Sequence, residues 1–132
     1  ERQAVLKRVG QVPIMNTLDM EISELDSGYC VASVPHKTRY NGIFNSFHGG
    51  LLQTVADTTA CLAVLSVAGA EANITTTDMN IRFLAPCIGP VTAKARVIKA
   101  GRTLCPVSVE LLDSSKRLVA IAQVNYIILR TE

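Results

Sequence analysis

The chain has 132 residues, of which 48% are hydrophobic and 18% charged, and its formal net charge is +2. That length suits one domain with a sizeable core, and the composition is typical of a folded globular protein rather than a disordered one. The mild charge, the absence of Trp and an aromatic content of 5% argue against nucleic acid as the partner, because bases are bound by basic patches and stacking aromatic rings.

The chain is predicted to begin with a helix followed by a β-hairpin. Residues 1–10 form a short amphipathic helix, and Pro13 ends it or begins a second turn. Residues 19–28 alternate apolar side chains with acids, which is typical of a half-buried strand. Residues 29–35 form a second strand, and the intervening Asp26-Ser27-Gly28 makes the pair a hairpin candidate.

A polar loop at residues 36–47 leads into one long helix over residues 49–70. This helix lacks Pro, ends near Gly69 and carries apolar side chains around nearly all of its circumference. A helix that is apolar all round is a buried helix.

Four strand-like stretches follow, at residues 72–86, 91–100, 102–113 and 117–130. Pro106 interrupts the third stretch, and we expect a bulge or an unpaired edge there. Strands grouped after one central helix predict an α+β fold in which a curved, mostly antiparallel sheet wraps around the helix. No second domain is indicated, so residues 1–132 are taken as a single domain.

We expect a cytoplasmic protein without membrane insertion. The first ten residues lack the apolar core of a signal peptide, and the longest uncharged apolar run, ACLAVLSVAGA, is too short to span a bilayer. No metal site is predicted, because the two histidines and the dispersed cysteines show no metal-ligand spacing. The cysteines are expected to be reduced thiols in the core; they are Cys30, Cys61, Cys87 and Cys105.

A lone carboxylate lies in the middle of the long helix. Asp57 is the one Asp, Glu, Lys or Arg in residues 41–69. A carboxylate on a buried helix is costly unless it is paired or hydrogen-bonded. Asp57 is therefore either a satisfied structural residue, or a nucleophile or general base in a cleft.

The start of the helix, His48-Gly49-Gly50, is a candidate for stabilising an oxyanion, although glycine pairs of this kind also serve as plain turns. Free backbone N–H groups point out of a helix N-terminus, and glycine lets a ligand approach them closely. Asp57 lies roughly 12 Å from Gly49 along a helix, too far for one carbonyl group to reach both. A two-fold dimer with antiparallel central helices would pair Gly49 of one subunit with Asp57 of the other, twice.

The stretch HGGLLQTVADTTACLAV resembles the His-Gly-Gly and Asp signature of hotdog-fold acyl-CoA thioesterases of the phenylacetate-pathway and human thioesterase-superfamily type. The resemblance continues through TTTDMNIRFLAP and VTAKARVIKAGRTLCPVSVELLDSSKRLVAIA, and covers roughly residues 35–128. It implies the hotdog fold, a homodimer that pairs again into a homotetramer, and hydrolysis of acyl-CoA to free acid and coenzyme A. It implies no cofactor beyond the coenzyme A of the substrate.

The resemblance also implies roles for individual residues. Asp57 would attack the thioester or activate water, the Gly49 N–H would polarise the thioester carbonyl, and His48 would orient the loop or contact the thioester. Thr76, with Thr75 as the alternative, falls where the family has a Ser or Thr that positions water.

The loop before the helix departs from the family pattern. The family often has Asn and Gly where this chain has Gly42 and Asn45, so the Asn role falls to Asn41 or to Asn45. Candidate contacts to substrate and to the phosphates of coenzyme A are Gly50, Arg82, Lys99 and Arg102, although plain surface positions are the alternative for the basic residues.

Two other functions are weighed against hydrolysis. An enoyl or 3-hydroxyacyl thioester hydratase of this fold usually has a His five residues after the Asp, where this chain has Leu62. A non-catalytic acyl-CoA-binding module is the second alternative, and the presence of Asp57 argues against it. Cys61, one helical turn after Asp57, is expected to pack in the core, because no basic partner is evident that would make it a nucleophile. The acyl group, aromatic or medium-chain, stays open.

Overall fold

The computed structural model describes residues 2–129. Its elements in chain order are α1 (Arg2–Val9), α2 (Pro13–Thr17), β1 (Glu21–Asp26), β2 (Tyr29–Val34), the 3-10 helix η1 (Thr38–Tyr40), α3 (Gly49–Ala68), β3 (Asn73–Phe83), β4 (Val91–Val97), β5 (Leu104–Leu112) and β6 (Leu118–Leu129). The predicted order of one helix, two strands, a long helix and four strands is confirmed, and Pro13 begins a second helix. Glu1 and Arg130, the outer ends of the first predicted helix and the last predicted strand, lie outside the described residues.

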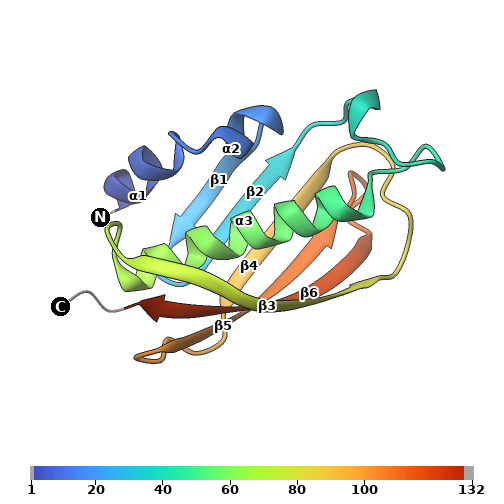
Figure 1. The fold of residues 1–132 in the computed structure, drawn as a ribbon. Helices are drawn as coiled ribbons and strands as arrows, with labels where there is room; N and C mark the ends of the chain where they lie inside the picture. Colours follow the sequence, from blue (N-terminus) through green and yellow to red (C-terminus); the bar gives the residue numbers. More distant parts are fainter. Residues whose placement is uncertain (1, 130–132) are drawn as a thin grey trace.

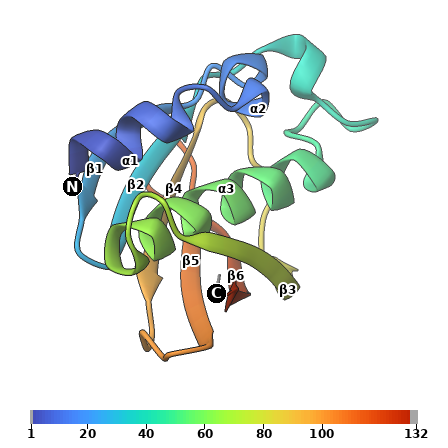
Figure 2. The same cartoon turned by 60° about the vertical axis from the view of Figure 1, so that its left-hand side comes forward.

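The six strands form one sheet in the order β1-β2-β4-β5-β6-β3, and every neighbouring pair is antiparallel. The sheet curves around α3, which crosses its inner face, while α1 and α2 lie to one side of α3 (Figures 1 and 2). This is the predicted α+β architecture of a central helix wrapped by an antiparallel sheet.

The helix α3 packs most closely on β2, β4 and β5. Its buried side chains include Leu52, Val55, Ala56, Thr59, Ala60, Leu62, Ala63, Val64 and Leu65. Within one chain, however, a stripe of α3 is not covered: Gln53 is exposed, and Thr54, Asp57 and Cys61 are only half-buried. The expectation of all-round burial is therefore wrong for the single chain, because the sheet curves around one side of the helix only. The uncovered stripe carries Asp57.

The same helix is long and apolar enough to cross a membrane, judged by length and composition alone. In this fold, 50% of its most apolar window is buried. Because it packs against the sheet, α3 fits the description of a core helix.

The N-terminal segment is tied to the end of α3. The β1–β2 hairpin turns at Gly28, whose φ of +75° suits glycine, and the Gly28 N–H donates to Ser66 Oγ of α3 at 2.8 Å. Arg8 of α1 donates from Nη1 to the carbonyl oxygens of Ala70 and Ala72, at 2.6 and 2.8 Å. These bonds place α1 beside the C-terminal end of α3.

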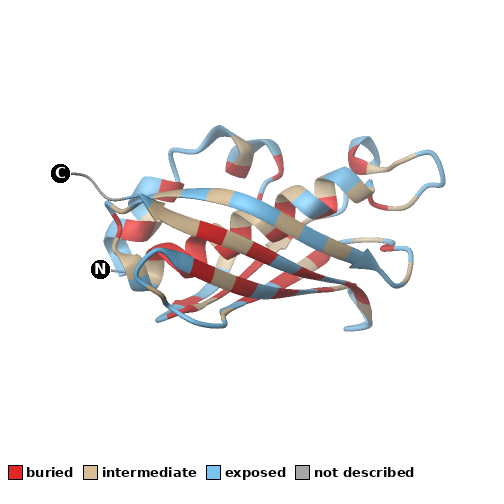
Figure 3. Ribbon diagram, turned by 60° about the horizontal axis from the view of Figure 1, so that its bottom comes forward, coloured by how far each residue is buried: buried red, intermediate tan, exposed pale blue. Residues whose placement is uncertain are grey.

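Among the strands in the described part of the chain, β3 pairs with β6 alone and forms one edge of the sheet. Among its described residues none is buried, as its alternating tan and blue segments show (Figure 3). A bulge at Thr77 separates two inward-facing pairs, Ile74 with Thr76 and Met79 with Ile81, all of which are half-buried. The extra residue shifts the two-residue alternation by one, so that both pairs face α3.

Pro106 lies in β5 without a bulge, since its pairing with Asn125 of β6 is regular. On the other side of β5, the last pair of the β4–β5 ladder is Val97 with Val107. One position beyond it, the Pro106 carbonyl accepts from the Ile98 N–H at 2.8 Å. The proline nitrogen faces the same side, toward β4, but Pro has no N–H to donate, so the reciprocal hydrogen bond of this pair cannot form and the β4–β5 ladder ends here. Of the two sequence-based alternatives, the bulge is wrong, and β5 is not an edge, because it lies between β4 and β6; what is unpaired at Pro106 is its nitrogen, on the β4 side.

Candidate active site

Asp57 lies midway along α3 on the uncovered stripe. Its Oδ1 accepts from the Thr76 hydroxyl of β3 at 2.9 Å and from the Tyr126 hydroxyl of β6 at 2.5 Å. Among the described residues, Oδ2 has no hydrogen-bond partner. The carboxylate is thus oriented through one oxygen, and the other is available for chemistry.

The sheet brings the two hydroxyl donors together. Thr76 and Tyr126 are directly opposite each other in the β3–β6 pairing, so their inward-facing side chains are neighbours beneath α3. Thr75 points to the other face of the strand and is exposed. Of the two threonines considered from the sequence, Thr76 is the one that contacts Asp57.

A cavity of about 380 Å³ opens beside the carboxylate. Its walls come from α3, from β3 and from the α1–α2 segment; the apolar ones are Val9, Val12, Ile14, Leu62, Leu65 and Ile74. Asp57, Thr76 and Tyr126 line it as well, together with Cys61 and Arg8. A largely apolar cavity with a few convergent polar groups is the usual form of a small-molecule site.

Neither Cys61 nor Tyr126 ionises readily in this setting. Burial, and secondly the nearby Asp57 carboxylate, raise the pKa of the Cys61 thiol to about 11, although Arg8 opposes the shift. Burial, followed by the hydrogen bond to Asp57, raises the pKa of Tyr126 well above its usual range. Cys61 is therefore a neutral thiol, as expected, and Tyr126 is a neutral hydroxyl that donates a hydrogen bond to Asp57 Oδ1.

The start of α3 leaves one backbone donor open. His48 caps the helix, because its Nδ1 accepts from the Gly50 N–H at 2.9 Å. Gly50 therefore cannot offer that N–H to a substrate while the cap persists. Among the described residues the Gly49 N–H has no acceptor, and the Phe83 ring lies so close to this glycine that a Cβ there would be 3.3 Å from Phe83 Cζ.

Asn41 is brought to the helix start and Asn45 is not. Asn41 lines a second cavity, of about 300 Å³, together with His48 and Gly50. Its buried Oδ1 has no hydrogen-bond partner among the described residues. Asn45 is exposed at a turn, with a φ of +59°. The geometry favours Asn41 for any role beside His48.

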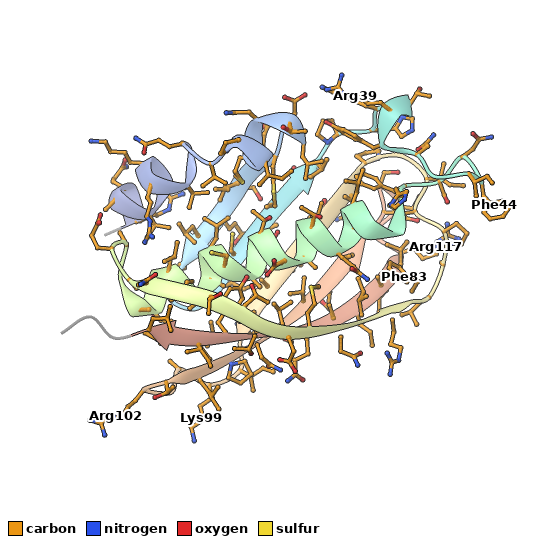
Figure 4. The ribbon with its side chains drawn as sticks, viewed as in Figure 1. Arg39, Phe44, Phe83, Lys99, Arg102 and Arg117 are labelled. Atoms are coloured by element: carbon orange, nitrogen blue, oxygen red, sulfur yellow. The ribbon has the colours of Figure 1, made fainter. Side chains whose placement is uncertain are left out.

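The three basic candidates lie away from Asp57 within one chain. Arg82 lines a groove on the outer face of the sheet and donates to Asn80 Oδ1 at 2.9 Å. Lys99 and Arg102 lie in the β4–β5 loop, at the end of the molecule opposite to Phe83 and the start of α3 (Figure 4). The single chain does not bring these side chains to the carboxylate.

Tyr126 and Arg8 were not identified from the sequence as parts of the site. The one available signal for Tyr126 was a hydroxyl within an aliphatic strand, because a buried phenol needs a hydrogen-bond partner. That the partner is Asp57 follows only from the strand order, which places β6 beside β3. For metals, no group of three or more His, Cys, Asp or Glu that could bind an ion occurs in residues 2–129, and the four cysteines are free thiols.

Comparison with known proteins gives the family. Residues 2–128 match a family model described as a domain of unknown function, DUF4442. A protein of Saccharolobus solfataricus whose name describes it as a candidate esterase is 31% identical over 131 residues, which is 98% of this chain and 91% of that protein.

Solved structures share the fold. A thioesterase family protein from Silicibacter pomeroyi is 25% identical, with a TM-score of 0.91 and coverage of 98% of each chain. The PaaI protein of the Escherichia coli phenylacetic acid degradation operon superposes with a TM-score of 0.90 at 22% identity, over 97% of this chain and 92% of that one. The thioesterase and esterase names support a hydrolase. The chain belongs to the DUF4442 family and has the hotdog fold of its thioesterase neighbours.

Proposed function

We propose that the protein is a cytoplasmic acyl-CoA thioesterase that hydrolyses an acyl-CoA to the free acid and coenzyme A. The observation that carries the proposal is the Asp57 carboxylate beside a largely apolar cavity: its Oδ1 is held by two hydrogen bonds, and its Oδ2 has no partner within residues 2–129. A carboxylate of this kind can activate water or attack a thioester, and the cavity is suited to an acyl group.

The proposed catalyst is a two-fold dimer. Asp57 and Gly49 are too far apart on one helix to act on one carbonyl. Two features support a second copy: the unpaired outer edge of β3 and the uncovered stripe of α3. Antiparallel packing of two α3 helices would bring Gly49 of each subunit to Asp57 of the other. Pairing of such dimers into a tetramer belongs to the same proposal.

The reaction uses two groups, one from each subunit. The Gly49 N–H, at the positive end of the α3 dipole, donates to the thioester oxygen as negative charge develops there. In one version, Asp57 takes a proton from water while the water oxygen attacks the carbonyl carbon. The C–S bond then breaks, and Asp57 returns the proton to the thiolate of coenzyme A. In the other, the Asp57 carboxylate attacks the carbonyl carbon, the C–S bond breaks and coenzyme A leaves as the thiolate; water then hydrolyses the resulting anhydride to the free acid and the Asp57 carboxylate, and the proton that this step releases goes to the thiolate. Incorporation of ¹⁸O from water into Asp57 during a single turnover distinguishes the second version.

The remaining candidates take supporting roles in the proposal. His48 fixes the loop through its cap on Gly50, and Asn41 contacts the thioester region. Arg82, Lys99 and Arg102 meet the phosphates of coenzyme A in the assembled oligomer.

Replacing Asp57 tests the proposal. The variant Asp57→Asn keeps an oxygen that can accept from Thr76 and Tyr126 but has no basic carboxylate, and Asp57→Ala removes the group altogether. Both are expected to lose turnover on a panel of short, medium, long and aromatic acyl-CoAs while retaining the fold and the dimer. The exposed Glu71, replaced by Gln, serves as the control for loss of one negative charge.

Three outcomes would contradict the assignment. Wild-type-like hydrolysis by Asp57→Asn would show that the carboxylate is not required. Hydration of crotonyl-CoA without hydrolysis would favour a hydratase, although the position that would hold its His is occupied by Leu62, which is buried. Tight binding of a non-hydrolysable acyl-CoA by a wild-type protein that turns over no thioester would indicate a binding module.

A further inference from the structure

Tyr126 is buried in the layer between the sheet and α3 and is only 2% exposed. Its hydroxyl lies 2.5 Å from Asp57 Oδ1 and 2.6 Å from the backbone carbonyl oxygen of the same residue. Three features of the sheet fix the position of the Tyr126 side chain: its pairing with Thr76 of β3, its pairing with Cys105 of β5, and the bulge that follows Thr76.

The phenol has one proton and two acceptors within reach. An O–H that donates to an ionised carboxylate is typically 2.5 to 2.7 Å long, and such charge-assisted bonds are roughly twice as strong as neutral ones. The carboxylate oxygen is therefore the favoured acceptor over the backbone carbonyl. Because burial disfavours the phenolate, Tyr126 is expected to act as a donor and not as a base.

We propose that Tyr126 is the positioning residue of the site: together with Thr76 it fixes Oδ1 of Asp57, so that Oδ2 alone faces the substrate. This inference rests on the proposed thioesterase function. With two donors on Oδ1, rotation of the carboxylate about its Cβ–Cγ bond would break both hydrogen bonds at once. The reactive oxygen is thereby placed before substrate binds.

The role is distinct from that of Thr76. Thr76 lies on the edge strand and is half-buried, so its hydroxyl can also contact water in the cavity. Tyr126 lies on a strand with neighbours on both sides; its hydroxyl donates to Asp57 and lies beside the Thr76 hydroxyl. The orientation of the carboxylate therefore depends on an interior strand.

The test compares Tyr126→Phe with a control that loses a different buried hydroxyl of similar surroundings. Thr59 is fully buried on α3, and its Oγ1 donates to the Val55 carbonyl at 2.7 Å without contact to Asp57. We expect Tyr126→Phe to lower kcat by about 10-fold to 100-fold with KM nearly unchanged, because a carboxylate misplaced by less than 1 Å reacts more slowly while the coenzyme A contacts persist. Thr59→Val should retain the wild-type kcat even if its melting temperature falls as far as that of Tyr126→Phe.

A second measurement does not require Tyr126→Phe to fold. The chain has three tyrosines, so 3-fluorotyrosine labelling gives three ¹⁹F resonances. One of them is expected to shift in Asp57→Asn, which changes the acceptor, while those of the other two rings stay in place. A resonance pattern unchanged by Asp57→Asn would overturn the inference.

The kinetic outcomes separate the two proposals. If Tyr126→Phe keeps the wild-type kcat, or loses no more than Thr59→Val, while Asp57→Asn is inactive, then the positioning role is wrong and the thioesterase proposal stands. If Asp57→Asn itself hydrolyses thioesters normally, the proposed function fails, whatever Tyr126→Phe does.

Discussion

Replacing Gly49 by Pro tests whether a single backbone N–H polarises the thioester carbonyl. Gly49 is the first residue of α3, the helix position where Pro is best tolerated. The residue before a proline must be extended, and His48 already has a φ of −59° and a ψ of 129°. The substitution therefore removes one N–H and is expected to keep the helix.

Gly49→Ala is the matched control. Any Cβ at this position lies 3.3 Å from Phe83 Cζ, so the ring must move by a few tenths of an ångström in both variants. The half-exposed Phe83 side chain has room to do so. Because Ala retains the N–H, the difference between the two variants reports the loss of that donor together with the proline ring carbon that takes the place of its hydrogen.

The expected difference is large. Removing one oxyanion-hole donor typically lowers kcat by about 10² to 10³. We expect Gly49→Pro to fall below Gly49→Ala by that factor, with similar melting temperatures, in an assay that follows the free thiol of coenzyme A. A kcat for Gly49→Pro within about threefold of that for Gly49→Ala would refute the reasoning.

Three further predictions concern the cavity and the thiols. At roughly 30 Å³ per water-sized group, the cavity beside Asp57 holds about a dozen non-hydrogen atoms. Octanoyl-CoA and phenylacetyl-CoA should therefore be hydrolysed faster than palmitoyl-CoA, and Val12→Trp should slow the hydrolysis of octanoyl-CoA more than that of acetyl-CoA. Equal rates for octanoyl-CoA, phenylacetyl-CoA and palmitoyl-CoA would contradict this. Burial and Asp57 raise the pKa of Cys61 to about 11, so Cys61→Ala should keep kcat within about threefold, and loss of turnover would count against it. Burial raises the pKa of the Cys30 thiol from 9.0 to about 12, so its contribution to the free energy of unfolding is complete below about pH 9 and is lost as the pH rises toward 12. Between pH 8 and about pH 10.5, urea unfolding should therefore show a smaller loss of unfolding free energy for Cys30→Ala than for the wild type. Equal losses in the two proteins would refute the linkage.

The order of elements could be predicted because each has a local signal. The hairpin has alternating side chains and a Gly28 turn, and α3 has a long apolar run between a polar turn and Gly69. The α+β fold follows from this order. The bulge at Thr77 could not be predicted, because TTTDMN is compatible with either register, and packing against α3 decides between them.

The site could be predicted only in part. Asp57 was found because a carboxylate is conspicuous in an apolar helix, and the distance from Gly49 indicated a second subunit. Tyr126 and Arg8 reach the cavity from β6 and α1, which are far from Asp57 in the sequence. Local sequence patterns predict neither the strand order nor the helix packing that brings these residues to the cavity. The use of the Gly50 N–H by His48 depends on one imidazole rotamer, which composition and spacing do not specify.

Subunit complementation tests the shared active site most directly. In a dimer of one Asp57→Asn and one Gly49→Pro subunit, one site combines an intact Asp57 with an intact Gly49, and the other site lacks both. Two inactive variants that are mixed, dissociated and reassociated at random should therefore regain about a quarter of the wild-type activity, since about half of the dimers are mixed and each has one working site. If Asp57 and Gly49 acted within one chain, no site in the mixture would be complete, and activity that stays at the level of the separate variants would contradict the account.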